Sequence, residues 1–197
     1  EKLATNSDAL VLSDEVYEHI VFDGKKHWSA SKFPELAKRS LVVASFGKTF
    51  HVTGWKLGYI IAPENLMKEF KKVHQYLVFC VNAPMQLAIA KYLEEPSRYN
   101  DIAKMYEKKR DAFLAQLEGS RFNFKPTEGS YFQLLDYSAI SKLDEVKFAE
   151  KLTKENGVAS IPVSVFYHQP LEQNCLRFCF AKSDETLEKA GAILREL

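Results

Sequence analysis

The chain has 197 residues, of which 46% are hydrophobic and 27% charged, values typical of a globular protein with its own core. Its 27 basic and 26 acidic residues are interspersed and leave a net charge of +1, which argues against nucleic acid or an anionic membrane as a partner. The sequence has no bilayer-length apolar run, no signal-peptide pattern in EKLATNSDAL and no disulfide-scaffold spacing among its three cysteines. The cytoplasm is therefore the expected compartment.

Three short apolar runs predict the strands of an α/β layer. They lie at residues 9–12, 41–44 and 58–62, and the first two are expected to be buried strands. The segment between these two contains a helical patch at residues 35–38 and is long enough for a parallel crossover. The link from the second run to the third is short and contains glycines, so the third strand is expected to run antiparallel.

Helical patterns follow the third run. Pro63 is expected to start a helix with one apolar face. Pro84 starts another, which ends by Pro96, and a long charged helix is predicted over residues 99–118 with Gly119 just past its end. The apolar face of the first helix consists of Leu66, Met67, Phe70, Val73 and Leu77.

Beyond Gly119 the pattern becomes that of a smaller α+β module. A last helix is expected to be capped by Ser183, with acidic residues in its first turn. The strands are predicted at residues 129–135, 158–163 and 176–181, and a further helix at residues 144–156.

Polar residues follow two of the predicted strands. Asp14 and Ser45 come at strand ends, and Lys48 follows Ser45 after a small residue. Ligands collect beyond the carboxyl ends of strands in open α/β sheets, and a partly desolvated lysine becomes a nucleophile towards carbonyls. Taken alone, Lys48 is more often a solvated loop lysine and Asp14 more often a cap of the following turn.

The combination of residue types points further than any one of them. A pyridoxal-phosphate site needs a lysine for the Schiff base and a carboxylate for the pyridine nitrogen. It also needs cations and hydroxyls for the phosphate, and an arginine whose fork binds the substrate carboxylate. The residues that could supply this set are Asp14, Ser45, Lys48, Lys56 and Arg177.

Arg177 lies in a strand whose large apolar residues alternate. Leu176, Phe178 and Phe180 share the core face, so Arg177 points to the other face between two small cysteines. That position allows it to face a cleft, and the alternative is an edge-strand arginine in water. The five histidines and the cysteine pair 175 and 179 show no metal-ligand spacing, so no metal site is expected.

Several motifs in this order resemble the class I pyridoxal-phosphate aminotransferases of fold type I. The similarity is greatest to the branch of methionine, kynurenine and glutamine aminotransferases, and it covers essentially the whole chain. The motifs that carry it are Ser13–Glu18, Ser45–Phe50, Gly54–Gly58, Val73–Gln75, Gly129–Phe132, Ile161–Ser164 and Leu176–Phe180.

The resemblance implies a role for each residue of the cofactor site. Lys48 would form the Schiff base with pyridoxal 5'-phosphate and then move a proton. Asp14 would pair with the pyridine nitrogen, and Tyr17 would hydrogen-bond the phenolic oxygen of the ring. Ser45 and Lys56 would bind the phosphate. Most class I members have arginine where this chain has Lys56, and the kynurenine-type branch accepts lysine there.

The resemblance also implies a substrate and a domain organisation. Arg177 would bind the α-carboxylate of a large neutral donor such as methionine, glutamine, an aromatic amino acid or kynurenine, with a 2-oxo acid as acceptor. Residues 1–96 would be the later part of the large α/β domain, and residues 97–197 the small C-terminal domain including the long linking helix. The family is dimeric, and residues 79–84 are similar to its crossover stretch.

Some expected parts of that family are absent from the sequence. The phosphate loop, the aromatic residue that stacks on the ring and the N-terminal closing segment belong to the family's front half, so a longer enzyme is expected. Two alternatives remain open: a carbon–sulfur β-lyase on the same scaffold, and a transcription regulator with an aminotransferase-like sensor domain.

Overall fold

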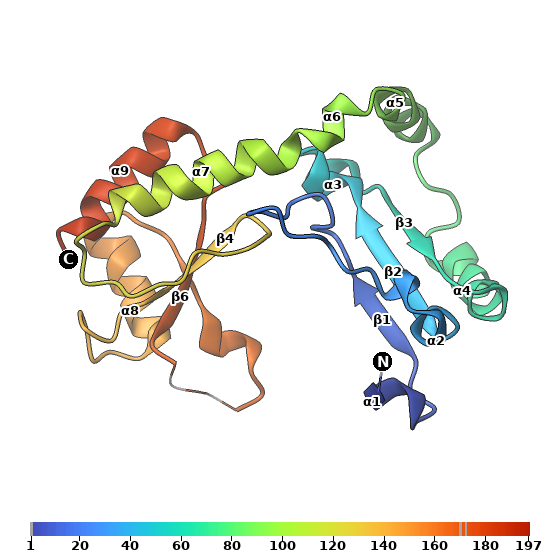
Figure 1. Ribbon diagram of the computed structural model, residues 1–197, viewed down its shortest axis with the longest axis horizontal. Coiled ribbons are helices and arrows are strands. Elements are labelled where there is room, and N and C mark those ends of the chain that lie inside the picture. The colour runs from blue at the N-terminus through green and yellow to red at the C-terminus, as the bar shows by residue number, and fades with distance from the viewer. Residues whose placement is uncertain (1, 170, 172) are drawn as a thin grey trace. The chain divides into compact units, whose positions relative to one another are not determined.

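The computed structural model describes residues 2–169, 171 and 173–197, and the chain divides into two compact units. One unit contains the residues up to Ile102, and the other is Ala103–Leu197. Both combine a three-stranded sheet with helices (Figure 1), which confirms the α/β class of the fold. None of the helices in the described ranges is long and apolar enough to cross a membrane.

The sheet of the first unit has the order β1-β2-β3. Its strands are β1 (Val11–Asp14), β2 (Ser40–Ser45) and β3 (Gly58–Ile61). β1 and β2 run parallel, and β3 pairs antiparallel with β2, as predicted from the lengths of the two connections. The crossover between the parallel strands contains η1 (Ala30–Lys32) and α2 (Pro34–Ala37).

β1 lies two residues later than predicted and is less buried. Its pairing with β2 begins at the amide of Val11 and continues to the amide of Glu15, which donates to Val43 O at 2.8 Å. The side chain of Leu12 is 72% exposed, because nothing among the described residues packs over it. The prediction of a buried first strand was therefore wrong for Leu12. The core of this unit is formed instead by Ile20, Phe22, Val42, Leu57 and Ile89.

The helices of the first unit begin one residue away from the predicted prolines. Pro63 is the N-cap of its helix, and Asn82 caps the next by accepting from the amide of Met85. The predicted long helix is broken at Asp101. This residue is the C-cap of a short first helix, and its amide donates to Ser97 O at 3.4 Å. The observed helices of this unit are α4 (Glu64–Leu77), α5 (Ala83–Leu93) and α6 (Ser97–Asn100). The next helix, α7 (Ile102–Gln116), belongs to the second unit except for its first residue.

The second unit has an antiparallel sheet of order β4-β6-β5, so β6 is its central strand. The strands are β4 (Phe132–Asp136), β5 (Ile161–Pro162) and β6 (Cys175–Cys179). β5 is shorter than the predicted strand: it begins only at Ile161, and the chain turns at Val163 into η4 (Val163–Phe166). The fully buried side chains include Leu135, Tyr137, Leu152, Leu176, Phe180 and Leu194.

The helices of the second unit pack closely around this sheet. α8 (Glu145–Lys151) continues into a π-helical turn, η3 (Leu152–Asn156), and ends at Gly157 with a φ of 71°. α9 (Asp184–Arg195) is capped by Ser183, as predicted. α9 lies beside α7 (Figure 1), and a Cβ on Gly191 would come within 2.4 Å of Cβ of Gln116, so glycine allows this approach.

Candidate functional site

Three of the predicted site residues lie at one edge of the first sheet. Asp14 is the last residue of β1, and Ser45 is the last residue of β2. Because these strands are parallel, their carboxyl ends share that edge (Figure 1). α3 (Phe46–Thr49) begins directly after Ser45 and carries Lys48. The sheet therefore brings a carboxylate, a hydroxyl and an amine to the edge where ligands of α/β sheets bind.

Lys56 belongs to the same loop as Lys48. Ser45 pairs with Gly58 across β2 and β3, and the amide of Phe46 donates to Leu57 O at 3.1 Å, so the segment between them is closed at its base. Lys56 follows η2 (Thr53–Trp55) near the end of this closed loop. Both predicted lysines are thus held by one short element at the end of β2 and the start of β3.

Gly47 allows the tight turn that holds Lys48. A Cβ at this position would lie 2.9 Å from Cα of Thr53, a distance that side chains do not tolerate. The backbone beneath Lys48 is therefore packed directly against the far arm of the loop. Lys48 itself is half-buried, and its Nζ has no hydrogen-bond or ionic partner among the described residues. Its amine is available to a ligand.

Ser45 also has a structural role. Its Oγ accepts from the amide of Gly47 at 3.1 Å and so caps α3, and it donates to Leu57 O at 3.3 Å. A hydroxyl has one donor and two acceptor sites, so donation to a phosphate would replace only the long bond to Leu57. The cap and the predicted phosphate contact are compatible.

Lys56 is exposed and has a left-handed backbone, with φ of 56° and ψ of 40°. His51, in the same loop, has a φ of 56°. Left-handed conformations cost non-glycine residues about 1–2 kcal/mol, and such strain concentrates at ligand sites. Two such residues lie within this one loop, which is compatible with the predicted phosphate role of Lys56.

The turn after β1 carries Asp14 and Tyr17. The exposed carboxylate of Asp14 accepts from the amide of Val16 through Oδ1 at 3.2 Å, which is the turn-capping bond of the alternative interpretation. This bond uses one carboxylate oxygen of an exposed side chain, so it leaves room for a second partner. Tyr17 is half-buried. The roles of Asp14 and Tyr17 towards the cofactor stay predictions.

Glu15 anchors this turn, and the sequence analysis missed it. The side chain is only 6% exposed. Its carboxylate accepts from Ser13 Oγ and the amide of Ala30, both at 2.9 Å, and from Nε2 of His27 at 2.8 Å. Burial alone would raise the pKa of Glu15, but the hydrogen bonds from His27, Ala30, Ser29 and Ser13 outweigh it and hold the pKa below its ordinary value.

Glu18 fixes the other side of the turn. The hydroxyl of Tyr59 on β3 donates to its carboxylate, and burial together with this carboxylate raises the pKa of Tyr59. The ring of Tyr59 also contacts Phe46, with 5.5 Å between centroids. Tyr17 therefore lies between two anchored glutamates. The only sign of these two anchors in the sequence is that Glu15 and Glu18 lie three positions apart, on either side of Tyr17.

We expect Glu15→Gln to lower the free energy of unfolding of the full-length protein by about 1–3 kcal/mol at pH 7, because a buried acceptor is lost. The lowered pKa of Glu15 means that its contribution is complete above its unfolded-state pKa, near 4.5, and is lost as the pH falls through the folded-state value. The difference between variant and wild type should therefore shrink below pH 4.5. Urea unfolding across this range measures it, with the exposed Glu118→Gln as control. Equal stabilities at pH 7 would contradict the anchoring role.

Arg177 lies in the middle of β6 and faces away from the core, as the alternation predicted. Its neighbours Leu176 and Phe178 are buried, at 0% and 4% exposed. Because β6 is the central strand, the edge-strand alternative was wrong. The guanidinium carbon lies 4.1 Å from the ring centroid of Phe132 and 4.9 Å from that of Phe166. Arg177 belongs to the second unit, so its role as substrate residue stays a prediction.

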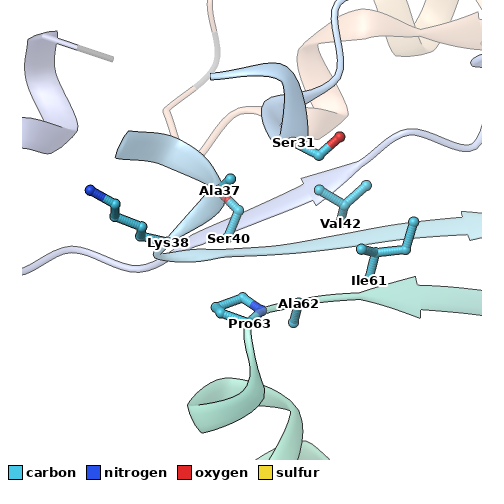
Figure 2. Close-up of a pocket in the computed structure, with 8 residues that line it drawn as sticks. All are labelled: Ser31, Ala37, Lys38, Ser40, Val42, Ile61, Ala62 and Pro63. Atoms are coloured by element: carbon cyan, nitrogen blue, oxygen red, sulfur yellow. The ribbon is translucent and has the colours of Figure 1, made fainter. Parts of the chain in front are cut away.

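An apolar pocket of about 370 Å³ lies at the opposite end of the first sheet from Asp14 and Ser45. Figure 2 shows it beside the start of β2 and the end of β3, with the amine of Lys38 pointing away from it. That amine pairs with Glu35 at 2.6 Å. The cation at the rim of the pocket is thus already paired, and the pocket is separate from the predicted site. Its lining consists of Ser31, Ala37, Lys38, Ser40, Val42, Ile61, Ala62 and Pro63.

Comparison with known proteins agrees with this geometry. The family model described as "Aminotransferase class I and II" matches residues 1–194, and the chain belongs to that family. A methionine aminotransferase of Escherichia coli (strain K12) is 49% identical over 191 residues, which cover 96% of this chain and 50% of the relative. A kynurenine–oxoglutarate transaminase of Dictyostelium discoideum is 38% identical over 95% of this chain and 48% of its own length.

Solved structures confirm the fold. A crystal structure from Escherichia coli, described as identifying a methionine aminotransferase function, matches with a TM-score of 0.95 at 48% identity and covers all of this chain and 52% of that one. The N-succinyldiaminopimelate aminotransferase of Mycobacterium tuberculosis matches with a TM-score of 0.93 at 31% identity, over 99% of this chain and 51% of its own. The chain thus spans about half the length of these relatives.

Proposed function

We propose that the full-length protein is an aminotransferase that uses pyridoxal 5'-phosphate to move an amino group from a large neutral amino acid to a 2-oxo acid. The observation that carries this proposal is the closed loop between β2 and β3. In this loop a half-buried amine that has no partner in the described part of the chain and an exposed cation in a left-handed conformation lie beside a strand-end hydroxyl. The relatives' names favour this activity over the β-lyase and the transcription regulator.

The residues at the sheet edge fit the cofactor. An aldehyde-bearing ring needs an amine that is not already paired, and the amine of Lys48 has no partner within residues 2–169, 171 and 173–197. A phosphate needs donors and a cation, and Ser45 and Lys56 bracket the same loop. A ring nitrogen needs a carboxylate, and Asp14 ends the neighbouring strand. When bound, the cofactor would supply an electron sink for the electrons of the substrate's α-carbon.

The chain's own residues would then position the reactants and move protons. The carboxylate of Asp14 would hold a proton on the ring nitrogen, and the hydroxyl of Tyr17 would donate to the phenolic oxygen. The amine of Lys48 would carry a proton between the substrate α-carbon and the cofactor, as a general base and then an acid. The guanidinium of Arg177 would bind the substrate carboxylate through its planar fork.

A panel of amino donors against 2-oxo acids, assayed with the full-length protein, tests the activity and substrate class. Methionine, glutamine, phenylalanine and kynurenine should each be converted with higher kcat/KM than aspartate or glutamate. The similarity to methionine and kynurenine aminotransferases supports this order. Release of thiol or ammonia from cysteine conjugates without transfer to the oxo acid would support the β-lyase instead.

We further propose that the protein forms a homodimer through the segment at the end of α4. Four consecutive large apolar residues are exposed there: Tyr76, Leu77, Val78 and Phe79, at 87%, 78%, 49% and 81%. Contiguous exposed apolar residues mark protein interaction sites.

Cytoplasmic location is proposed as well, and it is supported by the three cysteines, all of which are free.

Phe79→Asp should raise the dimer dissociation constant about tenfold or more, because it places a charge in an apolar contact. Sedimentation equilibrium of the full-length protein measures this constant. The matched control is Lys71→Asp, an exposed site on the polar side of α4 with a larger change in charge. A dimer unaffected by Phe79→Asp, or weakened equally by both variants, would contradict the proposed interface.

A further inference from the structure

The guanidinium of Arg177 is enclosed by two aromatic rings from different segments. Phe132 comes from the neighbouring strand β4, where it pairs with Cys179 in the sheet register. Phe166 comes from the end of η4 and is 61% exposed. The two ring centroids lie 4.1 and 4.9 Å from the guanidinium carbon. One wall is therefore part of the sheet, and the other belongs to a short turn outside it.

This enclosure affects how Arg177 can bind an anion. Aromatic faces attract a guanidinium and restrict its rotation, so less side-chain entropy is lost when its fork binds a carboxylate. Nε of Arg177 is buried and has no hydrogen-bond partner in the described part of the chain. The guanidinium is thus held by its ring contacts and is not committed to a protein carboxylate through Nε.

A buried carboxylate fixes the outer wall. Glu145, at the start of α8, is 3% exposed. Its Oε2 accepts from the amide of Ser164 in η4 at 2.5 Å, and its Oε1 accepts from the amide of Cys175 in β6 at 3.0 Å. One side chain therefore joins the turn that carries Phe166 to the strand that carries Arg177, two residues before the arginine.

The residues directly opposite Arg177 on the two neighbouring strands are apolar. Leu134 and Ile161 pair with it from either side, at 48% and 40% exposed. Cys175 follows on the same face, and burial with the nearby carboxylates of Glu145 and Asp136 raises the pKa of its thiol to about 11. The thiol therefore stays protonated at neutral pH. A ligand that places its carboxylate on Arg177 would lay its body against apolar side chains.

We propose that Phe166 is a positioning residue that, together with Phe132, orients Arg177 to bind a monocarboxylate with an apolar body, and that Glu145 holds Phe166 in place. This inference rests on the proposed function, because it assumes that Arg177 is the residue that binds the substrate carboxylate. It adds two residues, Phe166 and Glu145, to the determinants of substrate affinity.

The test compares an acid with its uncharged analogue. The probes are 3-phenylpropionate and its primary amide, 3-phenylpropionamide, and titration calorimetry on the full-length holoenzyme gives both dissociation constants. The wild type should bind the acid more tightly. Phe166→Leu should raise the dissociation constant of the acid about three- to tenfold and leave that of the amide unchanged, because only the acid uses the oriented guanidinium. Phe166→Tyr keeps the ring and should bind as the wild type does.

Two further variants separate orientation from general packing. Val165→Ala alters the exposed neighbour of Phe166 and should change neither constant. Glu145→Gln keeps the side chain's shape but replaces one acceptor by a donor. It should therefore weaken binding of the acid and not of the amide, as Phe166→Leu does. Equal weakening of acid and amide by Phe166→Leu, or no change in either, would overturn the positioning role.

Arg177→Ala distinguishes this inference from the function on which it rests. If Arg177→Ala removes the preference for the acid while Phe166→Leu does not, the inference fails and the proposed function stands. If Arg177→Ala leaves the preference intact, or if the wild type shows none, Arg177 is not the carboxylate-binding residue and both fail.

Discussion

Lys48→Ala should reduce turnover of the full-length enzyme about 10⁴-fold or more, because one amine supplies both the covalent attachment of the cofactor and the proton transfer at the α-carbon. Single-turnover measurements with methionine and a 2-oxo acid would detect this loss in each half-reaction. The variant should still fold, since Nζ of Lys48 makes no hydrogen bond or ion pair among the described residues. Its cofactor could still be held by the phosphate contacts.

The control for Lys48 is Lys56→Gly in the same loop. Glycine adopts the left-handed conformation of this position without strain, so the variant loses a cation while its backbone is favoured. It should bind the cofactor more weakly yet keep a turnover number near that of the wild type when the cofactor is saturating. A Lys48→Ala enzyme that retains wild-type turnover would remove this lysine from the mechanism.

Asp14→Ala should slow abstraction of the α-proton about 10²–10³-fold, because it removes the carboxylate whose negative charge keeps the ring nitrogen protonated. The capping bond between Asp14 Oδ1 and the amide of Val16 gives this experiment a matched variant. Asparagine keeps an oxygen that can accept from Val16, but it has no charge. If Asp14 is the ring partner, Asp14→Asn should therefore be nearly as slow as Asp14→Ala.

Stopped-flow rates of the first half-reaction, together with thermal unfolding of both variants, separate the two roles of Asp14. If Asp14 were only a turn cap, Asp14→Ala would lower the unfolding temperature, and Asp14→Asn would have the unfolding temperature and the rate of the wild type. Rates for Asp14→Ala that equal those of the wild type would leave Asp14 as a cap and nothing more.

Much of the first unit could be predicted because its signals are local. The apolar runs located β2 and β3, and the lengths of their connections gave one parallel and one antiparallel pairing. The strand-end position of Asp14 and Ser45 then placed both at one edge. The exposure of Leu12 could not be predicted, because hydrophobicity reports what a side chain favours and not which elements pack over it.

The anchoring residues could not be predicted because their partners are distant in the sequence. Glu15 is held by groups 12 and 15 residues away, and Glu145 by amides 19 and 30 residues away. A buried glutamate looks like any surface glutamate until the fold supplies its donors. In the same way, alternation in β6 predicted the side of the sheet on which Arg177 lies, but not the ring of Phe166.

The assignment of Lys48 is tested most directly by trapping the cofactor on the protein. Borohydride added to the full-length protein with pyridoxal phosphate should reduce the link between lysine and cofactor irreversibly. Peptide mapping should then find the cofactor on Lys48 and not on Lys56, although both lysines belong to one closed loop. Before reduction the protein should be yellow, and Lys48→Ala should carry no trapped cofactor. A reduced cofactor on Lys56, or on any lysine other than Lys48, would contradict the central claim.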